Sequence, residues 1–204
     1  EVALAARKTE KLAALAQETK ARVYACDAGE PAEVDRLFDQ VGRDIGPPDW
    51  VVYNASYRVR GPFIEIDAAE VKKSLLISCY AGFLVGQRAA RIMLERGGGS
   101  IFFTGASASV KGYAQSAPFA MGKCGLRGLA QSMARELAPK NVHVAHFVID
   151  GGIMRPGGDG RAAARGADGM LHPDHIAETY LHIHRQHRSA WTWEVELRPW
   201  VENF

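Results

Sequence analysis

The sequence predicts an α/β protein with a doubly wound, mostly parallel sheet in a single domain. Short runs of β-branched and aromatic residues alternate with amphipathic stretches along the whole chain. A parallel pair of strands cannot be joined by a tight turn, so this alternation indicates crossover helices between parallel strands. The 204 residues, 47% of them hydrophobic, fit one domain and contain no internal repeat.

The N-terminal quarter supplies the first three predicted strands. They lie at 2–4, 21–26 and 50–53, where apolar and aromatic residues gather in short runs. Between the second and third of them, Pro31 marks the start of a helix. Its apolar residues recur at i, i+3, i+4 and i+7, which places them on one helical face: Val34, Leu37, Phe38 and Val41.

A long helix is predicted over residues 67–96. Asp67 and Glu70 form an acidic variant of the capping box at its start, and the three glycines at 97–99 end it. The apolar run at 101–104 then predicts the fourth strand.

The rest of the chain adds a third helix over 116–137 and a fifth strand over 142–149. Residues 154–170 are rich in Gly, Arg and Ala, which predicts a loop or lid over a substrate pocket. Pro173 starts a further helix, and the alternating pattern at 192–197 predicts a closing strand.

Composition and charge narrow the class of protein. Twenty-five Lys and Arg residues against 23 Asp and Glu leave a net charge of +2, so the total gives no electrostatic case for nucleic acid or an anionic membrane. No apolar run approaches the roughly 18 residues of a membrane helix, and we expect no leader segment. The expected partners are a small-molecule substrate and copies of this chain. Three widely spaced cysteines in apolar surroundings indicate buried thiols and a cytoplasmic protein: Cys26, Cys79 and Cys124.

Small and polar residues follow four successive strands. Ligands of open α/β sheets bind beyond the carboxyl ends of the strands, and small residues there let a nucleotide approach the backbone closely. The same residues also suit tight strand-to-helix turns. The positions are Asp27, then Asn54, Ala55 and Ser56, then Gly105, Ala106 and Ser107, and finally Asp150 and Gly151.

Four segments occur in the order and at the spacing of one known family. They are 54–56 for a strand-end Asn-Asn-Ala-Gly turn, 98–105 for the strand before a catalytic serine, 123–129 for a helix with a Tyr-x-x-x-Lys motif, and 142–151 for the next strand and its turn. On these segments the whole chain resembles the short-chain dehydrogenase/reductase family. The resemblance implies a Rossmann-type fold with strand order 3-2-1-4-5-6-7, a nicotinamide cofactor, and homodimers or homotetramers formed through the long helices.

In this resemblance residue 1 falls at the start of the family's second strand. The first strand, and the glycine-rich turn that cradles the cofactor pyrophosphate at a helix N-terminus, then have no counterpart. Because that strand is central, its absence leaves two interior strand edges unpaired. We therefore expect a fragment that lacks roughly 30 residues, about the βα half of a βαβ unit, and that binds dinucleotide poorly.

The family's catalytic residues carry over only in part. The tyrosine that exchanges a proton with the substrate corresponds to Phe119, and the serine that orients the carbonyl corresponds to Ala106, with Ser107 adjacent. The asparagine of the water relay corresponds to Ser78. Only the lysine is kept, as Lys123, four residues after Phe119 and on the same helical face.

Two hypotheses follow from this altered set. The first is an NADP-dependent oxidoreductase for a carbonyl or alcohol substrate, in which another group replaces the tyrosine. The hydroxyls of Ser107, Tyr113 and Ser116 are nearby, although a turn, loop packing and a helix cap explain them equally. The second is a catalytically inactive nucleotide-binding protein that acts as a sensor or an oligomer subunit. Losing a positioned general acid typically costs about 10²–10⁴ in rate.

Cofactor choice follows from the turn after the first strand. A carboxylate there would bind the ribose of NAD, whereas the basic Arg7 suits the extra phosphate of NADP, so NADP is favoured over NAD. Asp27 corresponds to the family's acid near adenine, or it is an N-cap. Lys123 would hold ribose hydroxyls, the alternative being a surface lysine. The strand-end residues Asn54, Ala55, Ser56, Asp150 and Gly151 complete the predicted cofactor site.

Three further patterns have less specific explanations. The pairs His172/His175 and His184/His187 have metal-ligand spacing, but no cysteine or acid cluster completes a site, so we predict no metal and a solvated histidine face. The arginines of the 154–170 segment could favour an anionic substrate or simply be solvated. Glycines at 122, 125 and 128 lower the stability of the third helix, which indicates a close helix–helix contact at a subunit interface.

Overall fold

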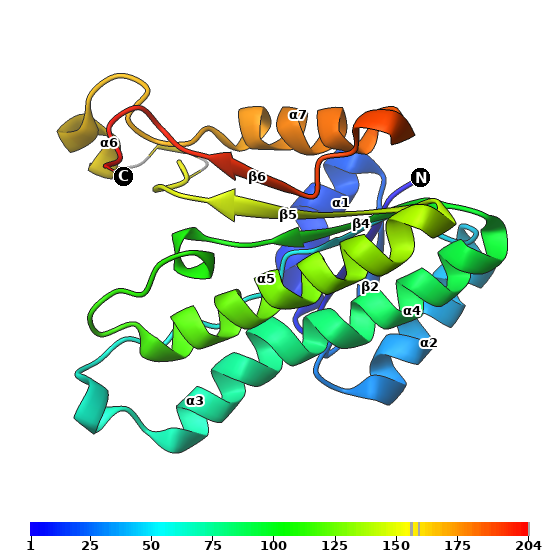
Figure 1. Cartoon of the computed structure of the whole chain (residues 1–204), viewed down its shortest axis with the longest axis horizontal. Coiled ribbons are helices and arrows are strands. Elements are labelled where there is room, and N and C mark those ends of the chain that lie inside the picture. Colours follow the sequence, from blue (N-terminus) through cyan, green and yellow to red (C-terminus); the bar gives the residue numbers. More distant parts are fainter. Residues whose placement is uncertain (156, 159, 204) are drawn as a thin grey trace.

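The computed structural model describes residues 1–155, 157–158 and 160–203 (Figure 1). All paired strands run parallel. They form two sheets with the orders β1-β2 and β3-β4-β5-β6. The strands are β1 (Ala3–Ala6), β2 (Arg22–Ala25), β3 (Trp50–Tyr53), β4 (Gly99–Thr104), β5 (Val142–Ile149) and β6 (Glu194–Leu197).

Helices connect these strands as the alternation predicts. Two short ones were not predicted: α1, because its apolar residues are all at least partly exposed, and α6, which lies inside the predicted loop 154–170. The α-helices are α1 (Ala13–Thr19), α2 (Pro31–Asp44), α3 (Ala68–Leu75), α4 (Ala81–Arg96), α5 (Ala117–Leu137), α6 (Gly160–Arg165) and α7 (Pro173–His184).

The helix predicted over 67–96 is interrupted. A five-residue π-helical turn, Leu76–Tyr80, separates α3 from α4. Asp67 caps α3 by accepting a hydrogen bond from the Ala69 amide at 2.8 Å. Glu70 does not close the capping box, because its carboxylate accepts a hydrogen bond from the Tyr57 hydroxyl at 2.6 Å. A π turn inside a helix often marks a functional position, and this one carries Ser78.

The doubly wound parallel arrangement is confirmed, and the sheet is divided in two. Among the described residues, β1 pairs only with β2, and β3 pairs only with β4. Each of β1 and β3 therefore presents one unpaired edge. The division lies where the resemblance has its first, central strand. That the chain is a fragment stays a prediction.

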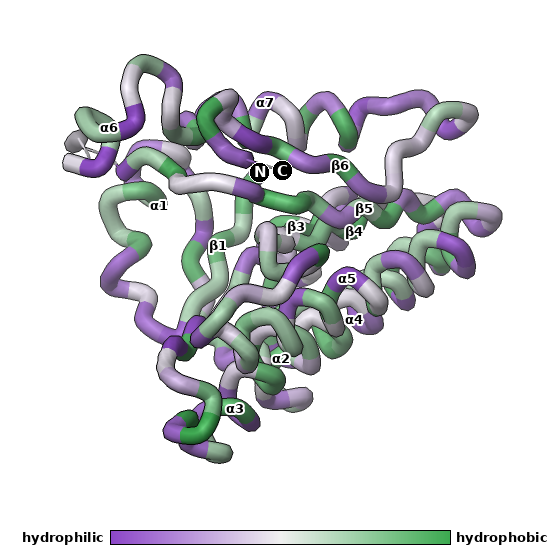
Figure 2. The backbone as a smooth tube through the Cα atoms, turned by 60° about the vertical axis from the view of Figure 1, so that its left-hand side comes forward, coloured by the Kyte–Doolittle hydropathy of each residue, from purple (hydrophilic) through white to green (hydrophobic). Residues whose placement is uncertain are grey.

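Two apolar clusters cover opposite faces of the larger sheet. Ile101 and Phe103 of β4 pack with residues of α2, α4 and α5 on one face. Phe102 points to the other face and packs with Phe147 and with Tyr180 of α7. Figure 1 shows α4 and α5 side by side on one face and α7 on the other, and in Figure 2 the tube of these helices changes between hydrophobic and hydrophilic colours along its length. Burial of β5 along all eight residues follows from this cover.

Two glycines of α5 have a role different from the predicted one. A Cβ at Gly122 would lie 2.8 Å from the Ser78 Cβ, and a Cβ at Gly125 would lie 2.8 Å from the Cys79 Sγ. At these two glycines the close contact is therefore made within the chain, between α5 and the π turn. Gly128 faces open space.

The structure tests the expectation that the three cysteines are buried thiols. All three cysteines are free, but only Cys26 is buried, while Cys79 is half-buried and Cys124 is exposed. The prediction of buried thiols is wrong for Cys124, because its position on α5 leaves it at the surface beside the Ala108 and Ser109 carbonyls.

None of the helices in the described residues is both long enough and apolar enough to cross a bilayer.

Candidate active site

The ammonium group of Lys123 lies against the end of β4. The residue is only 2% exposed, and its Nζ donates a hydrogen bond to the Thr104 carbonyl at 2.7 Å. No carboxylate of the described residues forms an ion pair with it. Burial lowers the pKa of Lys123 to about 8. An ammonium carries three N–H donors, so this group can donate further hydrogen bonds at the strand end.

Phe119 lies one helical turn before Lys123, and two cationic side chains lie over its ring. Its ring centroid is 5.9 Å from the Lys123 Nζ and 5.1 Å from the Arg58 Cζ. Arg58 comes from the loop after β3, so the ring lies where that loop meets α5. The ring offers a polarised face to both cations but no proton.

The loop after β4 contains a buried hydroxyl that sequence analysis did not single out. Ser109 is buried, and its Oγ accepts a hydrogen bond from the Ala106 amide at 3.1 Å. The Ala106 carbonyl accepts from the Ser109 amide at 2.8 Å, which closes a tight turn. Ser107 is half-buried, and its carbonyl accepts hydrogen bonds from the Val110 and Lys111 amides.

The other two candidate hydroxyls differ in exposure. Tyr113 is exposed and has the Lys111 ammonium over its ring at 5.9 Å. Ser116 is buried at the start of α5, but its side chain makes no capping hydrogen bond. Neither side chain has a described hydrogen bond that joins it to Lys123.

Ser78 in the π turn is fully buried, and its hydroxyl contacts the backbone of Tyr57. Its Oγ accepts a hydrogen bond from the Tyr57 amide at 3.1 Å and lies 3.3 Å from the Tyr57 carbonyl. The hydroxyl therefore anchors the loop after β3. Ser78 therefore supports the loop one residue before Arg58.

The residues at the ends of β1, β2 and β3 are exposed or half-buried. Asn54, Ala55 and Ser56 are exposed and follow β3 in an extended, irregular segment. Arg7 and Asp27, after β1 and β2, form an ion pair of 3.9 Å. Asp27 is not the N-cap of α2, which is Glu30. Its Oδ1 instead accepts from the Gly29 amide at 3.0 Å.

Asp150, directly after β5, ties three segments together. It is buried, and its carboxylate contacts the Lys111 Nζ at 3.3 Å and an Arg198 Nη at 3.1 Å. A hydrogen bond to Asp150 raises the pKa of Lys111. Gly151 follows in a space where a Cβ would lie 2.6 Å from the Pro199 Cδ, so this turn requires glycine.

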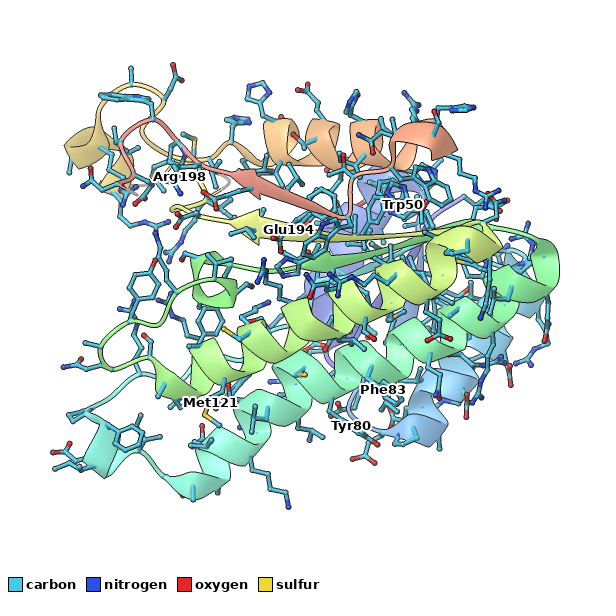
Figure 3. All side chains as sticks on the ribbon, in the orientation of Figure 1. Trp50, Tyr80, Phe83, Met121, Glu194 and Arg198 are labelled. Carbon is cyan, nitrogen blue, oxygen red and sulfur yellow. The ribbon has the colours of Figure 1, made fainter. Side chains whose placement is uncertain are left out.

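A partly buried polar network joins α5, β5 and β6. Arg127 donates two hydrogen bonds, of 2.6 and 2.7 Å, to the Glu194 carboxylate, and the His146 Nδ1 lies 3.1 Å from the same carboxylate. Figure 3 shows Glu194 on β6. His146 is 0% exposed, and burial lowers its pKa to about 4, so the ring is neutral. Its Nε2 has no hydrogen-bond partner in the described part of the chain.

Sequence analysis missed this network, although one signal for it existed. A histidine inside the apolar run Val142–Ile149 must be buried, and a buried polar ring requires a partner. The partner itself, on a strand 48 residues further along, has no local signature.

A family model described as enoyl-(acyl carrier protein) reductase matches residues 1–182. The chain belongs to the short-chain dehydrogenase/reductase family. A short-chain dehydrogenase from Rhodopseudomonas palustris superposes with a TM-score of 0.83 at 37% identity, covering 98% of this chain and 86% of that one. A metagenomic short-chain oxidoreductase in complex with NADP superposes with a TM-score of 0.83 at 27% identity over the same shares.

Curated members of the short-chain dehydrogenase/reductase family match part of the chain. A 3alpha-hydroxysteroid dehydrogenase of Mediterraneibacter gnavus is 32% identical over 115 residues, 56% of this chain and 46% of the relative. A 5-keto-D-gluconate 5-reductase of Escherichia coli is 33% identical over 112 residues, 55% of this chain and 44% of the relative. The chain spans about half the length of the curated relatives it matches.

Relative to the pattern of this short-chain dehydrogenase/reductase family, the structure brings only some of the predicted residues together. Lys123 lies against the Thr104 carbonyl at the end of β4, two residues before Ala106, and beside the Phe119 ring. Ser78 faces the Tyr57 backbone. Arg7 and Asp27 lie at the ends of the separate two-stranded sheet.

The remaining patterns are explained by packing. His184 is not part of a solvated face, because its ring stacks on Trp50 at 4.6 Å and its Nδ1 lies 3.0 Å from the Ser100 Oγ. Within the described residues no three potential metal ligands cluster. Arg165 of the 154–170 segment is paired with Glu202 at 2.5 Å, and residues 156 and 159 of that segment lie outside the described residues.

The burial of Lys123 predicts a pH dependence of stability. Its pKa is about 8 in the folded chain, against 10.5 for an ordinary lysine. Between these pH values the unfolded chain binds more protons, so the free energy of unfolding should rise with pH. The expected rise is about 3 kcal/mol at about 1.4 kcal/mol per pKa unit. Urea unfolding from pH 7 to 10.5 should show this rise for the wild type relative to Lys123→Met. Parallel curves would contradict it.

Proposed function

We propose that the protein is an NADP-dependent oxidoreductase that acts on a carbonyl or alcohol substrate, with Phe119 in the position of the usual tyrosine proton donor. The observation that carries the proposal is the buried Lys123 ammonium, which has no carboxylate partner among the described residues and lies at the carboxyl end of β4. Family membership supports the reaction class, and the related oxidoreductase in complex with NADP supports the cofactor.

The charged and polar residues at the strand ends support the binding of NADP. Arg7 supplies a cation for the ribose phosphate of NADP, and Asp27 lies beside it for the adenosine half. The open segment Asn54–Ser56 leaves its backbone accessible, and the free N–H donors of Lys123 suit ribose hydroxyls. Asp150 and Gly151 would flank the nicotinamide end. When bound, NADPH supplies the hydride for carbonyl reduction.

Within this proposal Lys123 is also the proton donor. One of its N–H groups delivers a proton to the carbonyl oxygen as that oxygen becomes a hydroxyl, and the neutral amine then takes a proton from water. A pKa of about 8 suits this role, because a general acid works best with a pKa near the operating pH. Thr104 holds the amine in place through its carbonyl.

The variant Phe119→Tyr tests the proposed function in the whole protein. We expect a measurable wild-type rate with a panel of carbonyl compounds and NADPH, and an increase of about 10²-fold in the variant, because a phenol between Lys123 and the substrate adds a better placed acid. Tyr113→Phe is the control and should leave the rate unchanged. An unchanged rate in Phe119→Tyr would show that the acid position is assigned wrongly.

A second candidate function is a nucleotide-binding protein without turnover. The bare Phe119 ring and the Ala106 methyl group favour it, because two of the family's reacting hydroxyls are replaced. Its expected result is calorimetric NADPH binding by the whole protein with no turnover of any carbonyl, together with activity in Phe119→Tyr.

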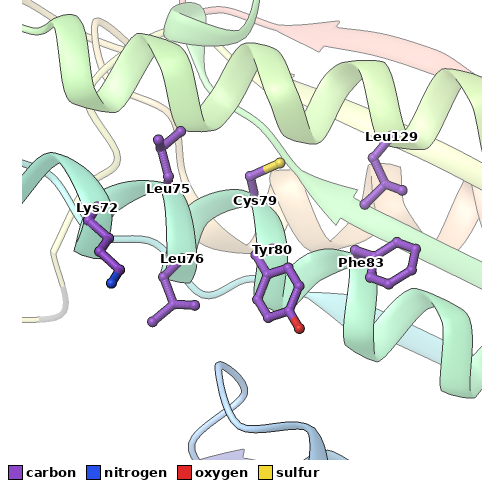
Figure 4. A pocket seen from close by; sticks show the side chains of 7 residues that line it. All are labelled: Lys72, Leu75, Leu76, Cys79, Tyr80, Phe83 and Leu129. Atoms are coloured by element: carbon purple, nitrogen blue, oxygen red, sulfur yellow. The ribbon is translucent and has the colours of Figure 1, made fainter.

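We further propose that the protein forms homodimers or homotetramers through α3, α4 and α5. An apolar groove on these helices supports this interface (Figure 4), and side chains lining it are exposed, Tyr80 by 43% and Phe83 by 40%. A monomer rarely exposes a contiguous apolar patch of this kind. The lining residues are Lys72, Leu75, Leu76, Cys79, Tyr80, Phe83 and Leu129.

Phe83→Asp should convert the oligomer into monomers, because the carboxylate would be desolvated at the centre of the contact. Light scattering of the whole protein measures this. The control is Leu15→Asp on α1, because Leu15 is also an exposed apolar residue but lies outside the groove. A monomeric wild type would contradict the proposed interface.

We also propose that the segment 154–170 covers the substrate pocket. Contacts between the two ends of the segment support this: Ile153 pairs with Leu171, and the Met154 amide donates to the Leu171 carbonyl at 2.9 Å. A cytoplasmic location is supported by the three free thiols.

A further inference from the structure

The loop after β3 is held rigidly at Tyr57. The Tyr57 amide donates to Ser78, and the Tyr57 carbonyl lies 3.0 Å from the Ser74 Oγ. The Tyr57 hydroxyl donates to Glu70 at 2.6 Å and accepts from the Lys73 ammonium at 3.1 Å. The backbone and the side-chain hydroxyl of Tyr57 are therefore both fixed to α3 and the π turn. This clamp, made of the hydrogen bonds of Tyr57, fixes the backbone position at which Arg58 begins.

Arg58 follows this clamp and lies over the Phe119 ring. Its Cζ is 5.1 Å from the ring centroid. The residue remains exposed to solvent, yet partial burial lowers the pKa of its guanidinium, and the neighbouring charge of Arg60 lowers it further. The guanidinium is thus partly desolvated against the ring that stands in the acid position.

Among the residues that the structure describes, Arg58 differs from other cations near the site because it has no carboxylate partner. Lys111 pairs with Asp150, and Arg127 pairs with Glu194. In the described residues no Asp or Glu forms an ion pair with Arg58. The Lys123 ammonium lies 5.9 Å from the same ring. The two cations make the surroundings of the Phe119 ring positively charged. A planar guanidinium with an open edge suits a carboxylate in a two-bond geometry.

We propose that Arg58 binds a carboxylate of the substrate and that the site therefore takes oxo acids or the corresponding hydroxy acids. This inference rests on the proposed function, since it assigns a substrate class to the same site. The hydrogen bonds of Tyr57 fix the backbone just before Arg58. The guanidinium itself packs against the Phe119 ring. The reacting carbonyl would then lie toward Lys123 and the carboxylate toward the loop after β3.

The test compares acids with their neutral counterparts in the whole protein. Short oxo acids and their primary amides are assayed with NADPH in the wild type and in Arg58→Gln. We expect the wild type to prefer each acid over its amide by about 10-fold or more. Arg58→Gln should raise KM for the acids about 10- to 100-fold, the range for a lost charge-assisted hydrogen bond, and leave the amides unchanged. Arg58→Lys should restore part of the preference, because it keeps the charge without the fork.

Arg60→Gln is the matched control. This arginine is two residues away and exposed on the same loop, so its removal tests the general charge of the loop. The preference for acids should survive it. Equal activity on acids and amides in the wild type, an equal effect of Arg58→Gln on both, or the same loss in Arg60→Gln would overturn the inference.

A binding measurement separates this inference from the proposed function. The Arg58 Nε–H resonance, assigned by its loss in Arg58→Gln, is followed during titration with 2-oxobutanoate. A saturable shift without turnover of any carbonyl would retain the carboxylate site and reject the oxidoreductase. Turnover of amides without a shift would reject the carboxylate site and retain the oxidoreductase.

Discussion

Lys123→Met is expected to lower kcat/KM for carbonyl reduction by about 10²–10⁴-fold, the range for the loss of a positioned general acid. In the proposed function the lysine is the catalytic residue, and its ammonium is buried at the end of β4. Methionine has a similar length and no charge to desolvate, so the fold should be retained. Steady-state assays with NADPH in the whole protein measure the loss.

The control for this prediction is Lys11→Met, which removes an exposed lysine outside the site and should leave kcat/KM unchanged. The pH profile provides a second readout: the wild type should lose activity as pH rises through about 8, because the neutral amine cannot donate the proton. A Lys123→Met variant with the wild-type rate would remove this residue from the mechanism.

Gly105→Ala is expected to destabilise the protein by about 3 kcal/mol, the upper part of the range for overpacking a core. A Cβ at this position would lie 2.5 Å from the His146 Cε1 and 2.7 Å from the Ser109 Oγ. His146 is fully buried and held by Glu194, so it cannot turn away without breaking that contact. Urea unfolding measures the loss.

A double-mutant cycle tests the physical cause of this effect. In a His146→Ala background the cost of Gly105→Ala should fall by more than half, because the contact with the His146 ring is gone and only that with the Ser109 Oγ at 2.7 Å remains. Gly42→Ala in α2 is the control, since a Cβ there meets nothing within 4 Å, and it should be neutral or stabilise the helix by up to about 1 kcal/mol. Equal costs of Gly105→Ala in both backgrounds would exclude the clash with His146.

Local patterns predicted most of the fold. Apolar periodicity located the strands at 50–53 and 142–149 with the bounds that the structure has, and it located α2, α5 and α7. The long helix was predicted as one element, because a π turn such as Leu76–Tyr80 depends on packing against α5 and not on its own residues. The short α1 has no buried face and hence no clear periodic signal.

The sequence predicted which helical face of α5 carries the candidate residues, but not which partners those of the site have. Spacing along one helix placed Lys123 and Phe119 on the same face. It could not show that Ser78 would turn to the Tyr57 backbone, 21 residues away. Nor could it show that Asp150 would pair with Lys111 across 39 residues. Such contacts join strand ends and loops whose separation in sequence carries no local pattern.

The sequence by itself determined the alternation of strands and helices and the family, because both depend on residue types at short, regular spacings. Tertiary structure alone decided which polar groups find partners. It paired Glu194 with Arg127 and His146 and left Arg58 over Phe119 without a carboxylate among the described residues. The physical reason is that burial and charge pairing depend on which segments the sheet brings together, and that is a property of the whole fold.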